Sequence, residues 1–170
     1  MTNPPRVIHV VQGEQAVSDR SDTVITTVLG SCVSACILDL ARGIGGMNHF
    51  LLPDAGPGRG DNRHAAAAME RLVNALLKAG AARGNLQAKL FGGAKMLRGL
   101  PDIGARNAEA AKLYLRQEGI MLAGADLCGE QARRIRFWPT TGRVQLLLLG
   151  RTEQPREAPS APIGGDVELF

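Results

Sequence analysis

The chain of 170 residues is poor in aromatic side chains, which make up only 4% of it. Proteins that bind single-stranded nucleic acid stack the bases on such rings. The net charge is only +4, and the single tight basic cluster is formed by Arg133, Arg134 and Arg136. We therefore expect no nucleic-acid partner, whereas a mildly basic enzyme that acts on an acidic protein agrees with this charge.

The sequence also lacks long apolar runs. Residues 144–149 form the longest run near the carboxyl end, far shorter than the roughly 20 residues of a membrane-spanning helix. The amino-terminal stretch MTNPPRVIHVVQGEQ has no hydrophobic core followed by a small-residue cleavage site, so it does not resemble a secretory signal. We expect a cytoplasmic protein without a membrane span.

The cysteines are too few and too irregular for a disulfide framework, because the sequence has three of them, Cys32, Cys36 and Cys128, without paired spacings. Cys32 and Cys36, with a histidine nearby, leave a zinc site as an alternative. A closed structural zinc site takes four ligands, and no second cysteine pair follows. We therefore expect no metal and no other cofactor.

Apolar residues make up 45% of the chain, so a core of valine, leucine, isoleucine and alanine is expected. We predict one domain at residues 1–150 and a disordered or loosely attached tail at residues 151–170, where three of the nine prolines lie. The apolar end of this tail, at Val167, Leu169 and Phe170, leaves a short docking peptide as an alternative.

Apolar periodicity predicts eight strands and two helices in the domain. Helices are expected at 63–80 and 103–118, the second capped by Asp102 and closed by Gly119. Residues 13–21 are expected to form a loop, and the glycines at 43, 45 and 46 a turn. The order predicts an α+β fold, a layered mixed β-sheet architecture with two main helices packed on one side. The expected strands are 7–11, 24–28, 33–37, 47–52, 87–91, 120–127, 134–138 and 144–149.

The residues that suggest chemistry lie between 26 and 49, where Thr26, Cys32 and His49 follow one another. A thiol attacks carbonyl carbon as thiolate, so a reactive cysteine needs a base, usually histidine, and the base needs a third group that orients it. A hairpin between the strands at 33–37 and 47–52 would bring His49 alongside Cys32. The spacing is therefore compatible with a cysteine nucleophile and a histidine base. It leaves open the alternatives that Cys32 is a buried structural thiol and His49 a core histidine.

Two assignments in this region have competitors. Thr27 competes with Thr26 as the orienting group, and strand alternation favours Thr26, which shares parity with Cys32 if no bulge intervenes. Ser31 competes with Cys32 as the nucleophile, but the thiol is intrinsically superior. The backbone amides near Gly30, Ser31 and Cys32 are candidate donors to the oxyanion of a tetrahedral intermediate.

Five segments resemble one family in order and separation: LGSCVSACILD, GGMNHFLLP, KLFGGAKM, IGARN and FWPTTGRV. Together they are similar to the bacterial chemoreceptor glutamine deamidases, the CheD family, over roughly residues 7–150. The resemblance implies that Cys32 is the nucleophile, His49 the base and Thr26 the third member of the triad. At Cys128 the family more often has glycine, so the turn before Gly129 is expected to differ here.

The resemblance also implies the reaction, the partners and the fold. It implies hydrolysis of selected glutamine amides on the cytoplasmic helices of chemotaxis receptors, with hydrolysis of receptor glutamate methyl esters as a second activity. A response-regulator phosphatase is an implied binding partner, and the implied fold resembles the glutamine-deamidating domain of bacterial toxins. The alternatives are a thiol hydrolase of the same fold with another protein substrate, and a non-catalytic chemotaxis adaptor.

Overall fold

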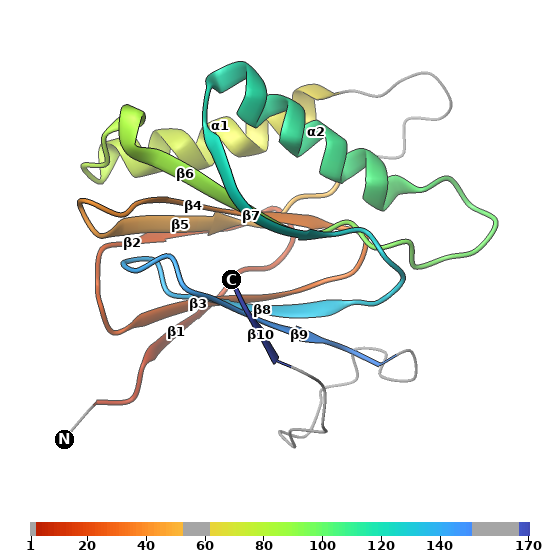
Figure 1. Cartoon of the computed structure of the whole chain (residues 1–170), viewed down its shortest axis with the longest axis horizontal. Coiled ribbons are helices and arrows are strands. Elements are labelled where there is room, and N and C mark those ends of the chain that lie inside the picture. Colours follow the sequence, from red (N-terminus) through yellow and green to blue (C-terminus); the bar gives the residue numbers. More distant parts are fainter. Residues whose placement is uncertain (1–2, 53–61, 151–166) are drawn as a thin grey trace.

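The computed structural model describes residues 3–52, 62–150 and 167–170. Figure 1 shows three layers: two β-sheets packed face to face, and two helices that cover the outer face of one of them. The predicted α+β class, with layered mixed sheets and both helices on one side, is confirmed.

Sheet A is the layer without helices, and its strand order is β1-β3-β8-β9-β10. β1 runs parallel to β3, whereas the other neighbours are antiparallel. The strands are β1 Arg6–His9, β3 Thr23–Leu29, β8 Arg133–Phe137, β9 Val144–Leu148 and β10 Val167–Leu169.

Sheet B is the middle layer, with the order β2-β5-β4-β6-β7. Its only parallel pair among the described strands is β6 and β7, as expected when a helix connects two neighbouring strands. The strands are β2 Gln15–Ser18, β4 Val33–Asp39, β5 Ile44–Asn48, β6 Leu86–Gly92 and β7 Met121–Leu127.

The helices are α1 Asn62–Lys78 and α2 Ile103–Glu118, and a short 3₁₀ turn, η1 Arg83–Asn85, precedes β6. Both predicted ends of α2 are confirmed. The carboxylate of Asp102 accepts a hydrogen bond from the backbone N–H of Ala105 at 2.9 Å, and Gly119 closes the helix with a φ of 67°.

Two predictions about strands are wrong. Residues 15–18, expected in a loop, form β2, and β5 begins at Ile44 and ends at Asn48 instead of spanning 47–52. Gly45 therefore lies inside a strand and not in the turn. A Cβ at this position would collide with the carbonyl oxygen of Pro139, so the glycine serves the close approach of the two sheets and not a change of chain direction.

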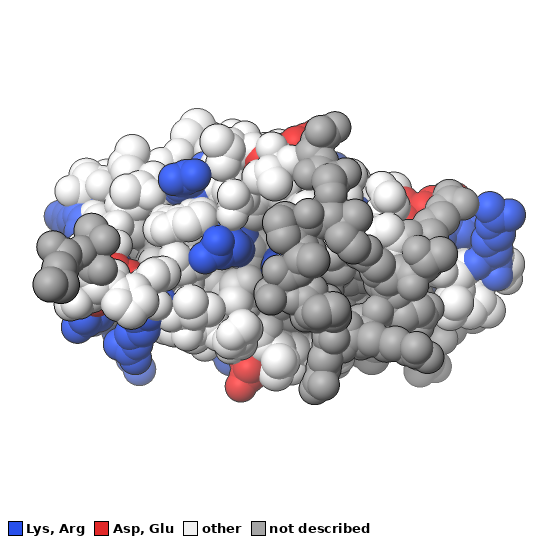
Figure 2. Space-filling model, turned by 90° about the horizontal axis from the view of Figure 1, so that it is seen from below, with Lys and Arg blue, Asp and Glu red and all other residues white. Residues whose placement is uncertain are grey.

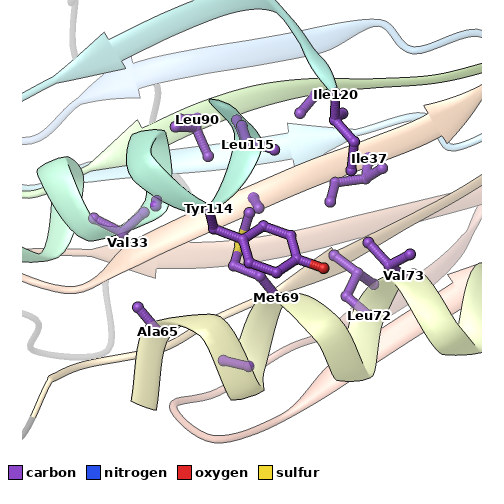
Figure 3. Packing of buried hydrophobic residues seen from close by; sticks show 14 of the residues in the cluster. Val33, Ile37, Ala65, Met69, Leu72, Val73, Leu90, Tyr114, Leu115 and Ile120 are labelled. Atoms are coloured by element: carbon purple, nitrogen blue, oxygen red, sulfur yellow. The ribbon is translucent and has the colours of Figure 1, made fainter. Parts of the chain in front are cut away.

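The two interfaces between layers hold separate clusters of apolar side chains. Figure 3 shows the cluster under the helices, where Met69 of α1 and Tyr114 of α2 meet Val33 and Ile37 of β4. The second cluster, here called the inter-sheet core, lies between sheets A and B. Its buried members are Val10, Ile25, Leu29, Cys36, Leu38, Met47, Phe91, Ile135, Phe137, Val144 and Leu146.

The apolar end of the predicted tail is an ordered part of sheet A. β10 pairs with β9, and the backbone of Phe170 exchanges two hydrogen bonds with Val144. The ring of Phe170 lies edge-on to Phe91, with 5.7 Å between the ring centroids. Residues 167–170 are therefore part of sheet A, and residues 151–166 lie outside the described residues.

Among the described helices, none combines the length and apolar character that crossing a membrane would take.

Candidate active site

His49 lies directly after β5 and is 8% exposed. The segment from Val10 to Glu14 wraps around it: the amide of Gly13 donates to the His49 carbonyl at 2.8 Å, and the His49 amide donates to the Glu14 carbonyl at 3.2 Å. Its ring nitrogen Nδ1 lies 2.8 Å from the hydroxyl oxygen of Thr27 in β3. The imidazole thus spans the gap between the two sheets.

The hydrogen bonds around Thr27 determine which ring nitrogen carries the proton. The Thr27 hydroxyl donates to the carbonyl oxygen of Val10 at 2.6 Å. A hydroxyl has one proton to donate, so toward His49 the Thr27 oxygen acts as acceptor and Nδ1 carries the proton. In the neutral ring Nε2 is then left with a free lone pair, which is the state a general base requires.

Thr26 does not take the orienting role that strand parity favoured. Its hydroxyl donates to the backbone carbonyl of Ile135 in β8 at 2.7 Å, within sheet A. The parity argument needed an unbroken strand from Thr26 to Cys32, but β3 ends at Leu29 and β4 begins at Val33. The loop between them resets the alternation, so Thr27, the competitor, is the residue that contacts the imidazole.

Cys32 lies in this loop, immediately before Val33. Val33 and Phe50 form an antiparallel bridge in which each amide donates to the other's carbonyl, at 3.0 and 2.9 Å. Cys32 and His49 each precede one member of this pair and are therefore diagonal neighbours, with Cα atoms about 7–8 Å apart in such an arrangement.

Both side chains also lie on the same side of sheet B. Cys32 packs against the inter-sheet core, and His49 reaches Thr27 of sheet A across the same space. The thiol of Cys32 lies 4.0 Å from the side-chain oxygen of Gln12, which is carried by the segment that wraps His49. A carboxamide oxygen is thus already placed beside the thiol.

Burial keeps this pair neutral in the free protein. It raises the pKa of the Cys32 thiol above its ordinary value, because the charged thiolate is penalised away from water. Burial also lowers the pKa of His49, and the hydrogen bond to the Val10 carbonyl opposes this more weakly. The arrangement therefore pairs a thiol with an unprotonated imidazole, and not a thiolate with an imidazolium.

The loop that carries Cys32 is held through its carbonyl oxygens. The amides of Gly93 and Ala94 donate to the carbonyls of Cys32 and Gly30, at 2.8 and 3.0 Å. The Gly92-Gly93 pair, which lies in the KLFGGAKM segment, thus belongs to the segment that holds residues 30–32, here called the nucleophile loop. Within the described residues, the backbone amides of Gly30, Ser31 and Cys32 donate to no other group.

Sequence reasoning missed two buried asparagines near the site. Asn48 accepts a hydrogen bond from the Ala35 amide at 2.9 Å and donates to the Ala68 carbonyl of α1 at 3.3 Å, so it fixes β5 just before His49. Asn107 of α2 is 0% exposed and contacts the Cys32 loop. The sequence signal for Asn107 was a polar residue among alanines on the buried face of a helix.

The other cysteines lie apart from this chemistry. Cys36 is fully buried in the inter-sheet core. Cys128 has a φ of 70°, a left-handed conformation that favours glycine, so it imposes on this turn the strain that a glycine would avoid. No group of three or more histidine, cysteine or acidic side chains suited to a metal ion occurs in the described part of the chain.

The basic cluster predicted at Arg133, Arg134 and Arg136 is divided by the alternation of β8. Arg133 is 2% exposed and binds the side chain of Asp126 at 2.5 Å and its carbonyl oxygen at 2.7 Å, whereas Arg134 faces outward. Burial lowers the pKa of Arg133, against the opposing effect of Asp126. Arg133 therefore holds the turn after β7 and does not contribute to a basic surface.

Comparison with known proteins identifies relatives over nearly the whole chain. The family model described as CheD chemotactic sensory transduction matches residues 51–147. A protein of Caulobacter vibrioides is 50% identical, with 96% of this chain and 92% of that protein covered. One of Acidiphilium cryptum is 47% identical, with 97% and 94% covered. Both carry the name "Probable chemoreceptor glutamine deamidase CheD".

Among solved structures, the Neisseria meningitidis protein NMB0706 is similar with a TM-score of 0.46 and 12% identity, over 74% of this chain and 63% of that one. This likeness is too low to support an inference about activity.

Proposed function

Because the chain belongs to the CheD family, we propose that it is a chemoreceptor glutamine deamidase that works through Cys32 and His49. The observation that carries the proposal is the placement of His49: Thr27 holds its Nδ1 at 2.8 Å, and its ring lies on the same side of sheet B as Cys32. A base oriented in this way beside a thiol is the arrangement that nucleophilic catalysis by cysteine needs.

In the proposed reaction, Nε2 of His49 takes the thiol proton and the Cys32 sulfur attacks the carboxamide carbon of a receptor glutamine. The protonated His49 then gives its proton to the leaving nitrogen, which departs as ammonia and leaves a thioester. His49 next activates a water molecule that hydrolyses the thioester. The products are glutamate and ammonia, and the free thiol is restored.

The tetrahedral intermediate needs donors for its negative oxygen. The amides of Gly30, Ser31 and Cys32, which have no acceptor within the described residues, are the proposed donors. A missing donor of this kind typically costs about 100- to 1000-fold in rate. Thr27 takes the third place of the proposed triad, in place of Thr26. Its hydroxyl orients the imidazole more weakly than a carboxylate would.

The substrate surface is proposed to include the segment after Ala94. Met96, Leu97 and Leu100 are exposed by 47%, 63% and 53%. The side chain of Met96 lies next to Gly30, since a Cβ at Gly30 would be 3.4 Å from Met96 Cγ. Lys95 and Arg98 lie in the same segment. Exposed apolar side chains among positive charges suit an amphipathic acidic helix, such as those of a receptor's cytoplasmic part.

Further parts of the proposal rest on the family resemblance alone. They are hydrolysis of receptor glutamate methyl esters, which would use the same thioester, binding of a response-regulator phosphatase, and a cytoplasmic location. Residues 1–150 are proposed as the catalytic domain, with residues 151–170 as a carboxyl-terminal tail. No cofactor is needed by the proposed chemistry.

The test is incubation with receptor cytoplasmic fragments, followed by mass spectrometry. Each deamidated glutamine adds about one dalton, and the Cys32→Ala variant should add none because it lacks the nucleophile. Cys128→Ala is the matched control and should keep the activity. If the wild-type protein binds the fragments but leaves their mass unchanged, the chain is an adaptor and not a deamidase.

A further inference from the structure

Asn107 connects the two chain segments that carry Cys32 and His49. Its Nδ2 donates to the carbonyl oxygen of Ser31 at 2.8 Å, and its Oδ1 accepts from the backbone amide of Leu52 at 2.8 Å. Ser31 directly precedes Cys32, and Leu52 follows His49 by three residues. One buried side chain of α2 thus spans both sides of the site.

The two hydrogen bonds of Asn107 depend on a close approach of α2 to the loop at Gly93 and Ala94. Gly104 lies three residues earlier and therefore on the same face of the helix. A Cβ at this position would collide with the carbonyl oxygens of Gly93 and Ala94. Because Gly104 has no side chain, the helix packs directly on this loop, which also holds the carbonyls of Gly30 and Cys32.

The direction of each carbonyl determines the direction of the following amide. In a planar trans peptide the N–H points opposite to the C=O. Asn107 holds the Ser31 carbonyl toward α2, so the Cys32 N–H points away from the helix. Within the described residues that N–H donates to no other group, as expected of a donor that is kept for a ligand.

We propose that Asn107 is a positioning residue that, by holding the Ser31–Cys32 peptide, turns the Cys32 amide toward the oxyanion of the tetrahedral intermediate. The inference rests on the proposed deamidase function. Asn107 does not touch the substrate, and it acts through the peptide whose carbonyl it binds.

Two variants separate the two hydrogen bonds of Asn107. Asn107→Asp keeps an acceptor for the Leu52 amide and, at a pH where its buried carboxyl is ionised, has no donor for the Ser31 carbonyl. Asn107→Ala removes both bonds. For either variant kcat for receptor deamidation should fall by about 10- to 1000-fold, with KM changed by less than about twofold, because only the transition state carries the oxyanion.

Alkylation of Cys32 by iodoacetamide distinguishes a positioning role from a merely structural one. If Asn107 only maintained the fold, its replacement would change the alkylation rate as well as kcat. The reagent reacts at a saturated carbon and forms no oxyanion, so both variants should react within about twofold of the wild-type rate. Ala108→Gly, which weakens α2 without touching Ser31, is the control and should lower Tm but not kcat below Tm. If kcat and alkylation fall together, Asn107 only maintains the fold and the proposal is overturned.

The wild-type protein provides a measurement that does not depend on the variants folding. Amide hydrogen exchange followed by NMR should show the Cys32 amide exchanging quickly, whereas a slow, protected amide would contradict the proposed direction of its N–H. Absence of wild-type turnover on receptor fragments would refute the proposed function, and the exchange rate would still decide whether the Cys32 amide is free.

Discussion

The Thr27 hydroxyl connects the imidazole to the backbone of the segment at Val10, and it has only one proton for this task. That proton goes to the Val10 carbonyl, which leaves the Thr27 oxygen as acceptor for Nδ1 of His49. A single side chain thereby selects the tautomer with a free Nε2. Thr26, its neighbour in sequence, serves sheet A instead.

Replacing the two threonines separately tests this division of roles. Thr27→Val should lower kcat for deamidation by about 10- to 100-fold, because the imidazole loses its acceptor and its preferred tautomer. Thr26→Val should change kcat by less than about twofold and cost about 1 kcal/mol of stability for its lost hydrogen bond. Steady-state kinetics and urea unfolding of both variants give the answer. The opposite ranking would return the role to Thr26.

The neutral state of the Cys32 and His49 pair predicts a distinctive pH dependence. Because burial raises the pKa of Cys32, its alkylation by iodoacetamide should continue to rise above the ordinary thiol value of about 8.5. Because burial lowers the pKa of His49, the acid limb of kcat/KM should lie below about 6.5. A flat alkylation rate from pH 6 to 8 would instead indicate a preformed thiolate and contradict the neutral pair.

At the scale of elements, β10 brings Phe170 into contact with Phe91 at the edge of the inter-sheet core. Phe170→Ala should therefore lower the free energy of unfolding by about 1–3 kcal/mol, less than the loss of a fully buried ring. Leu169, which is 62% exposed, is the matched control, and Leu169→Ala should cost less than about 0.5 kcal/mol. Urea unfolding measures both, and equal effects would mean that the ring is not packed.

The sequence predicts elements well where periodicity and end signals agree. α2 was predicted with its bounds and both caps because Asp102, the apolar face and Gly119 all indicate the same helix. β2 was missed because QAVS is short and lies among polar residues, and its pairing with β5 decides its structure. Gly45 was misplaced because glycine marks a turn as readily as it marks close packing between layers.

In the site, too, contacts between residues far apart in the sequence decide what the local pattern cannot. Cys32 and His49 were indicated by residue type, spacing and family resemblance. Parity along the chain favours Thr26, whereas Thr27 contacts the imidazole, because the break in the strand is set by the packing of the nucleophile loop. The role of Asn107 could not be predicted from the sequence, because its two hydrogen-bond partners lie 76 and 55 residues away in sequence.

At the scale of the whole molecule, positive charge exceeds negative charge in residues 1–150, which contain 18 Lys and Arg and 12 Asp and Glu. Figure 2 shows basic side chains spread over the outer face of the molecule seen from below, with few acidic ones among the described residues. Such a distribution attracts an acidic partner over a distance and does not create one concentrated patch.

This charge predicts that salt weakens the reaction with an acidic receptor fragment. Between about 50 and 300 mM salt, kcat/KM should fall by about threefold or more, because screening shortens the range of the attraction. The alkylation of Cys32 by uncharged iodoacetamide is the control and should not change. A kcat/KM that is independent of salt would show that recognition depends on apolar contacts alone.

The position of β10 has a consequence for association between molecules. It occupies the outer edge of sheet A, so the amide and carbonyl groups on that side of β9 are paired within the chain. Were β10 removed, those groups would form an open template on which a strand from a neighbouring molecule could add. A protein shortened before Val167 is thus expected to be prone to concentration-dependent aggregation. The last strand therefore protects the protein against association through the edge of sheet A, besides being a part of the fold.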